Sequence, residues 1–80
     1  MNKRKIASAL SEVTGYRAKD FDVDGLLKCC NVKCRDVKSV YVSNGKYIRM
    51  VVVSPSPYRI YEDICTCSSG DLLHVRNFLK

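Results

Sequence analysis

The sequence predicts an α+β fold, in which a small antiparallel sheet is covered on one face by an N-terminal helix and a C-terminal helix. The first observation is a pair of β-branched and aromatic runs around Asn44-Gly45, together spanning Val37–Val53. The second is a further β-rich segment, Tyr58–Cys67, and the third is a helical stripe of apolar residues at each end of the chain. At 80 residues, the chain is expected to form a single small basic domain over residues 1–80, with no linker.

Asn44-Gly45 marks the turn of the predicted hairpin, because both residues tolerate the positive φ that a type I′ turn requires. A two-residue loop places Ser43 opposite Lys46 and sets the register of both strands. One face, expected to point toward the core, then carries Val37, Ser39, Tyr41, Ile48, Met50 and Val52. The other face carries Lys38, Val40, Val42, Tyr47, Arg49 and Val51. Ser54-Pro55-Ser56-Pro57 is expected to end the second strand, because proline cannot donate to a ladder.

Helices are predicted before and after the sheet. Residues 3–14 form an amphipathic stripe that ends before Gly15. A shorter helix is expected over Gly25–Asn31, with Asp22 or Asp24 as its cap. The capping-box spacing from Ser68 to Asp71 favours a C-terminal helix over Leu72–Leu79, with a strand as the alternative. The predicted core consists of Ile6, Leu10, Val13, Leu26, Val37, Tyr41, Ile48, Met50, Val52, Ile60, Ile64, Leu72, Val75 and Leu79.

The formal net charge is +6, and most of the excess lies in residues 1–19 and 28–59. This balance favours a polyanionic partner, either nucleic acid or an acidic protein surface. We expect no membrane association, because no apolar run approaches the roughly 20 residues of a membrane span. A basic cluster precedes Ile6–Leu10, but the apolar run stops at Ser11, short of a signal peptide. We therefore expect a cytoplasmic protein of unknown oligomeric state.

The five cysteines fall into two groups, one before the hairpin and one after the third strand. A weak zinc candidate combines Cys29 (or Cys30), Cys34, Cys65 and Cys67. The C-x-C spacing in a predicted strand is poor for zinc, so packing as small hydrophobes is favoured over a metal site or disulfides, and no cofactor is expected. The alternating aspartates from Asp20 to Gly25 resemble the opening of an EF-hand calcium loop, but the twelfth position is Asn31 rather than Glu, and helix capping is favoured.

The sequence favours a binding function over catalysis. There is one histidine and no glycine-rich phosphate loop, so no enzyme chemistry is predicted. Cations and aromatic rings that could contact phosphates and bases are instead concentrated near the hairpin and at the N-terminus. The candidate binding residues are Lys3, Arg4, Lys5, Lys38, Lys46, Tyr47, Arg49, Arg59 and Tyr61. Nucleic acid is the favoured partner, and the alternative is a protein-binding inhibitor, adaptor or regulator that docks on a larger protein.

Overall fold

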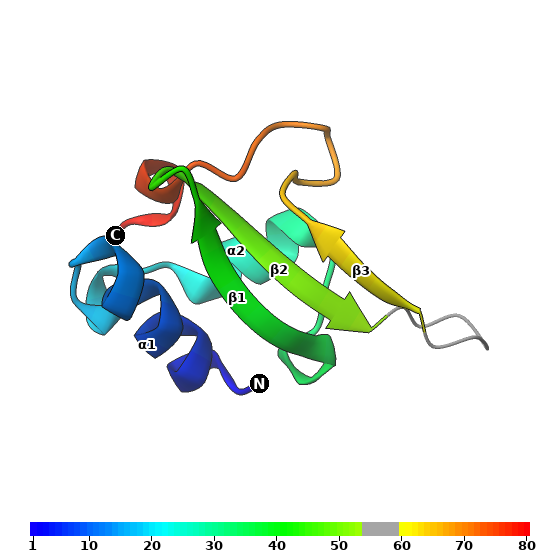
Figure 1. Cartoon of the computed structure of the whole chain (residues 1–80), viewed down its shortest axis with the longest axis horizontal. Helices are drawn as coiled ribbons and strands as arrows, with labels where there is room; N and C mark the ends of the chain where they lie inside the picture. The colour runs from blue at the N-terminus through cyan, green and yellow to red at the C-terminus, as the bar shows by residue number, and fades with distance from the viewer. Residues whose placement is uncertain (54–59) are drawn as a thin grey trace.

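A computed structural model describes residues 1–53 and 60–80, and it contains two α-helices and one sheet (Figure 1). Ser54-Pro55-Ser56-Pro57 and the start of the predicted third strand lie outside the described residues. The elements in chain order are α1 (Lys3–Thr14), α2 (Val23–Cys30), β1 (Val37–Ser43), β2 (Tyr47–Val53) and β3 (Tyr61–Ile64), with 3₁₀ turns at Ala18–Asp20, Cys34–Asp36 and Val75–Phe78.

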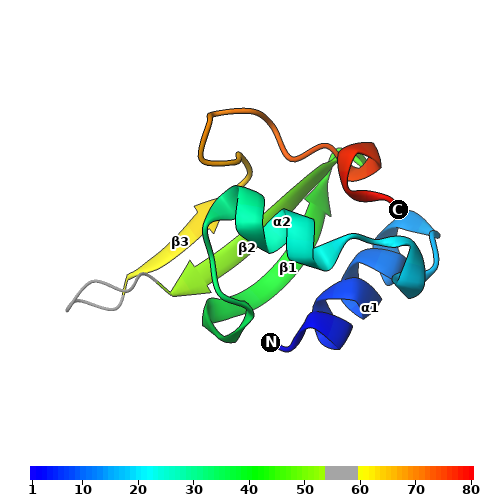
Figure 2. The same cartoon turned by 180° about the vertical axis from the view of Figure 1, so that it is seen from behind.

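The sheet is antiparallel with strand order β1-β2-β3. Both helices lie on one side of it, with α2 crossing behind the strands and α1 packed along β1 (Figures 1 and 2). The predicted α+β fold is therefore confirmed. Among the described residues, no helix combines the length and apolar character needed to cross a bilayer.

Local capping signals account for the ends of both helices. The Asn2 side chain accepts a hydrogen bond from the Lys5 amide at the start of α1, and Gly15 ends that helix with φ +81°. These bounds match the prediction. Helix α2 starts at Val23, two residues before the predicted start at Gly25, because Asp22 is the residue that caps it. Its end is also earlier, since Asn31 adopts the left-handed conformation and serves as the cap.

The hairpin forms as predicted, but its register differs by one residue. Asn44 and Gly45 both have positive φ, and the Ser43 carbonyl accepts a hydrogen bond from the Lys46 amide. However, Ser43 pairs with Tyr47 rather than with Lys46, which becomes an extra loop residue. The Lys46 carbonyl instead accepts from the Val75 amide at 2.8 Å, so the C-terminal segment binds the residue that the predicted ladder would have used.

This shift exchanges the two faces of β1. Val40 and Val42 pair with Met50 and Ile48, so they point toward the core instead of away from it. Ser39 and Tyr41 lie on the opposite face, contrary to the prediction. A bulge at Lys38 adds one residue to β1, so Val37, before the bulge, points toward the core as predicted. It is buried opposite Val52. The predicted faces of β2 are unchanged.

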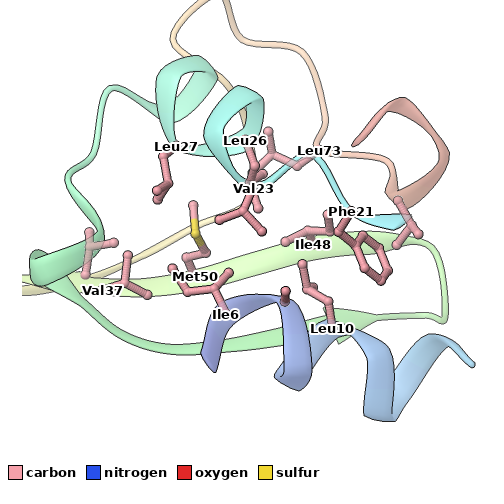
Figure 3. Close-up of a cluster of buried hydrophobic side chains, with 13 residues drawn as sticks. Ile6, Leu10, Phe21, Val23, Leu26, Leu27, Val37, Ile48, Met50 and Leu73 are labelled. Carbon is pink, nitrogen blue, oxygen red and sulfur yellow. The ribbon is translucent and has the colours of Figure 1, made fainter. Parts of the chain in front are cut away.

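The core lies between the helices and the sheet, where Ile6 and Leu10 of α1 meet Ile48 and Met50 of β2 (Figure 3). Burial is confirmed for eight predicted core residues: Ile6, Leu10, Leu26, Val37, Ile48, Met50, Val52 and Val75. Ile64 and Leu79 pack against this cluster while partly exposed. The prediction is wrong for Val13, Tyr41, Ile60 and Leu72, which are exposed, and it omits the buried residues Ala7, Phe21, Val23, Leu27 and Leu73.

The predicted C-terminal helix is wrong. Only the 3₁₀ turn Val75–Phe78 is helical, and the residues before it are extended and form isolated bridges. The Leu73 carbonyl accepts from the Ile48 amide at 2.7 Å, and the Leu73 amide donates to Cys65 at 3.0 Å. The predicted helix would bury Leu72 and leave Leu73 outside the core. In the extended backbone the opposite holds, with Leu73 buried and Leu72 exposed. Within the described residues, strand β3 runs from Tyr61 to Ile64 and so ends before Cys67, the predicted end.

Candidate functional site

The face of the sheet opposite the helices is the main candidate for a binding surface. We call it the outer face, and its side chains come from Lys38, Ser39, Tyr41, Tyr47, Arg49, Val51, Val53, Tyr61 and Asp63. No helix among the described residues crosses this face (Figure 1). Two of its tyrosines expose much of their surface, 38% for Tyr41 and 61% for Tyr61.

Asp63 of β3 holds two side chains from the neighbouring strands in fixed positions. Its carboxylate accepts a hydrogen bond from the Tyr41 hydroxyl and another, at 3.2 Å, from Nε of Arg49. The Arg49 guanidinium also lies 5.8 Å from the centroid of the Tyr41 ring, within range of a cation–π contact. The hydroxyl contact raises the pKa of Tyr41, because it stabilises the protonated phenol. The same contact and then Arg49 lower the pKa of Asp63.

A second cation and aromatic ring lie together on the same face. The Lys38 ammonium is 5.7 Å from the centroid of the Tyr61 ring, and both side chains are exposed. Lys38 lies at the bulge of β1, and its side chain reaches across β2 to the Tyr61 ring of β3. Two of the strands thus contribute one tyrosine each, Tyr41 and Tyr61, and each ring has a cation beside it.

The structure brings together only part of the predicted binding set. Lys38, Arg49 and Tyr61 share the outer face with Tyr47. The Tyr47 ring, however, packs edge-on against His74, with centroids 5.6 Å apart, and has no cation beside it among the described residues. Lys46 is exposed in the hairpin loop. Sequence reasoning missed Tyr41, because the predicted register placed it in the core.

The predicted N-terminal cations are not on the outer face. Lys3, Arg4 and Lys5 are exposed on α1, which lies on the covered side of the sheet. Lys3 forms an ion pair with Asp24 of α2, and this contact raises the pKa of Lys3 and lowers that of Asp24. Arg59 lies outside the described residues.

The proposed metal ligands are only partly clustered. Cys29, in the last turn of α2, lies beside Cys67, and the Ser68 amide donates to the Cys29 carbonyl at 2.8 Å. Cys34 belongs to the 3₁₀ turn before β1, and Cys65 follows β3. Across residues 1–53 and 60–80, no three Cys, His, Asp or Glu side chains are arranged to hold a metal ion. In the aspartate-rich segment, the Asp22 carboxylate accepts a hydrogen bond from the Gly25 amide, as expected for a helix cap. Asp24 forms an ion pair with Lys3.

Comparisons with known proteins assign no family to the chain. No family model matches it, and no curated protein or solved structure matches it either. Its function is therefore inferred from the chemistry of the outer face and of the cysteine cluster.

Proposed function

We propose that this chain is a small non-catalytic protein that binds nucleic acid, in single-stranded form, through the outer face of the sheet. The observation that carries the proposal is the placement of two exposed tyrosines, each beside a cation, on a face that no described helix covers. Tyrosine rings can stack on unpaired bases, while lysine and arginine contact phosphates. Bases in a duplex are already stacked on each other, so this arrangement favours a single strand.

The charges of the outer face fit an anionic ligand. Arg49 and the Tyr41 hydroxyl both contact Asp63, so the one carboxylate of this cluster is already compensated within the protein. Among residues 1–53 and 60–80, the Lys38 ammonium contacts the Tyr61 ring and forms no ion pair, so it can bind a phosphate. Lys46 in the exposed hairpin loop would extend the positive surface along the strand of nucleic acid.

The N-terminal cations have a secondary role in this proposal. Lys3, Arg4 and Lys5 lie on the covered side of the sheet, so they contribute to long-range attraction of a polyanion rather than to base contacts. We also propose a cytoplasmic location, because all five cysteines are free thiols and that compartment keeps thiols reduced.

One observation favours a second candidate, a protein-binding inhibitor, adaptor or regulator. Strand β3 is an edge strand among the described residues, and a groove of 330 Å³ lies beside it. The groove is lined partly by the apolar residues Val52, Val53 and Ile64 and partly by charged residues such as Glu62. An extended segment of a partner protein could pair with β3 and place a side chain in this groove.

The proposal is tested by fluorescence anisotropy with labelled single-stranded RNA and DNA oligonucleotides at several salt concentrations. We expect binding that weakens as salt rises, with Tyr61→Ala costing about 1–3 kcal/mol through lost stacking. Lys38→Gln should weaken binding. It should also reduce the slope of log K against log salt concentration by about one, the value for one lost phosphate contact. Lys28→Gln is the matched control, because it removes the same charge from α2 on the covered side.

Two results would contradict the proposal. Equal weakening by Lys38→Gln and Lys28→Gln would show that only net charge matters. Absence of oligonucleotide binding at low salt, together with a stoichiometric protein partner in pull-downs, would favour the second candidate. In that case, a substitution in the groove such as Ile64→Asp should release the partner.

A further inference from the structure

A short loop after β3 is attached to the end of α2 through its backbone. We call residues 67–71 the Cys67 loop. The Cys67 amide donates to the Asp71 carbonyl at 2.7 Å, and the Gly70 amide donates to the Cys67 carbonyl at 2.9 Å, so the loop is closed on itself. The Ser68 amide donates to the Cys29 carbonyl at 2.8 Å. This last bond brings the Cys67 loop against the final turn of α2, which carries Cys29.

The sulfur of Cys67 has a hydrogen-bond partner within its own loop. The Ser69 hydroxyl oxygen lies 2.8 Å from it. The Ser69 hydroxyl is in addition 3.0 Å from the Asp71 carboxylate, to which it can donate its single proton. When Cys67 loses its proton, this hydroxyl can turn from Asp71 to donate to the thiolate instead.

The two thiols consequently differ in acidity. Hydrogen bonds from Ser69 and then Cys29 lower the pKa of Cys67 from 9.0 to about 7. Burial, followed by the contact with Cys67, raises the pKa of Cys29. Cys30, the next residue of α2, is buried deeply enough for its pKa to rise to about 12. At neutral pH, Cys67 therefore provides the thiolate and Cys29 stays protonated beside it.

We propose that Cys67 and Cys29 form a thiol–disulfide exchange site that reacts with low-molecular-weight disulfides such as oxidised glutathione. The site is independent of the proposed nucleic-acid interface, which lies on the outer face of the sheet. Cys67 is the attacking residue and Cys29 is the residue that resolves the adduct. Ser69 is a positioning residue that stabilises the thiolate.

The reaction proceeds in two steps. The Cys67 thiolate attacks one sulfur of the glutathione disulfide, which forms a mixed disulfide on Cys67 and releases one glutathione thiolate. Cys29 then transfers its proton to solvent and attacks Cys67 Sγ, which releases the second glutathione thiolate. Both thiolates take up protons at neutral pH. Two protein thiols are thus oxidised to one disulfide, and one glutathione disulfide is reduced to two glutathione molecules.

The expected rate follows from two opposing effects. At pH 7, a thiol with a pKa of about 7 is half ionised, whereas one with a pKa of 9.0 is ionised to about one part in a hundred. The less basic thiolate is also less nucleophilic, by about eightfold for this difference in pKa. The net result is a reaction about sixfold faster for Cys67 than for an ordinary cysteine.

The test uses the reduced full chain, oxidised glutathione at pH 7 and mass-spectrometric mapping of each cysteine after acid quenching. We expect an early glutathione adduct on Cys67, followed by a Cys29–Cys67 disulfide. In the folded protein Cys67 should react about sixfold faster than in the same protein unfolded in urea, where its pKa returns to the ordinary range. Equal rates in the two states, or a main disulfide between other cysteines, would overturn the proposal.

Variants separate the roles of the residues. Cys29→Ser should accumulate the glutathione adduct on Cys67, because no resolving thiol is present, and Cys34→Ser is the control that should still form the Cys29–Cys67 disulfide. Ser69→Ala should shift the pH profile of the Cys67 reaction to higher pH, and Ser69→Thr should restore it. An unchanged pH profile in Ser69→Ala would contradict the positioning role, and rapid resolution in Cys29→Ser would contradict the role of Cys29.

Discussion

The β1–β2 hairpin and the C-terminal segment, residues 65–80, are held in place in different ways. The hairpin pairs two neighbouring strands through a turn at Asn44-Gly45, so its interactions are close in sequence. The C-terminal segment forms backbone hydrogen bonds with distant residues. The Phe78 carbonyl accepts from the Asp22 amide at 2.7 Å, and the Lys80 amide donates to the Asp20 carbonyl at 2.6 Å. The difference shows that an alternating pattern identifies a strand most clearly when its partner is the next segment of the chain.

The largest expected effect concerns Leu73, which links the C-terminal segment to the core. Its side chain is fully buried, whereas 50% of the neighbouring Leu72 is exposed. We expect Leu73→Ala to lower the free energy of unfolding by about 3 kcal/mol through lost burial and a cavity. Leu72→Ala should change it by less than about 0.5 kcal/mol. Urea unfolding of both variants measures the difference, and a larger loss in Leu72→Ala than in Leu73→Ala would contradict the extended backbone.

The sequence was sufficient to predict the elements whose signals are local. The α1 bounds follow from an apolar stripe that ends at Gly15, and the hairpin follows from Asn44-Gly45. The C-terminal structure was mispredicted because the amides of Ile48 and Val75 pair across regions that no local pattern connects. A helical stripe containing Leu72 and Val75 was present, but tertiary hydrogen bonds outweighed that weak local preference.

The candidate sites show the same limit. Lys38, Arg49 and Tyr61 were identified from composition and spacing, and they do share the outer face. Tyr41 was missed because one extra loop residue reverses the faces of a strand, since side chains alternate with a period of two. The position of the Cys67 loop against the turn that carries Cys29 depends on how the loop after β3 meets α2, and no spacing rule specifies that contact.

A smaller effect is expected at the hairpin turn. Gly45 has φ +68°, and no atom lies within 4 Å of the position that an added Cβ would occupy. Gly45→Ala should therefore destabilise the protein by about 1 kcal/mol through backbone strain alone. Asn44→Gly is the control, because glycine adopts positive φ freely and should be nearly neutral there. Thermal unfolding measures both changes, and an unaltered stability in Gly45→Ala would mean that the turn has another conformation.

The smallest effect tests whether the outer face of the hairpin depends on β3. Tyr41 and Arg49 belong to the hairpin, but Asp63, which binds both, does not. Asp63→Asn should therefore return the pKa of Tyr41 from its raised value toward 10.0, as followed by nuclear magnetic resonance of the tyrosine ring. Glu62→Gln is the matched control, since it removes the adjacent charge of β3 from the other side of the strand. A Tyr41 pKa that is unchanged by Asp63→Asn would contradict the contact.

The contact between Tyr41 and Asp63 should stabilise the folded state less at both high and low pH. The raised pKa of Tyr41 stabilises the folded state below about pH 10, and this contribution is lost as pH rises through the folded-state pKa. The lowered pKa of Asp63 stabilises the folded state above about pH 4, and this contribution is lost as pH falls. Both side chains are more than a third exposed to solvent, so the change in stability should be small at physiological salt. Both contributions require the contact between Tyr41 and Asp63. The free energy of unfolding of Asp63→Asn should therefore show neither of these two pH dependences.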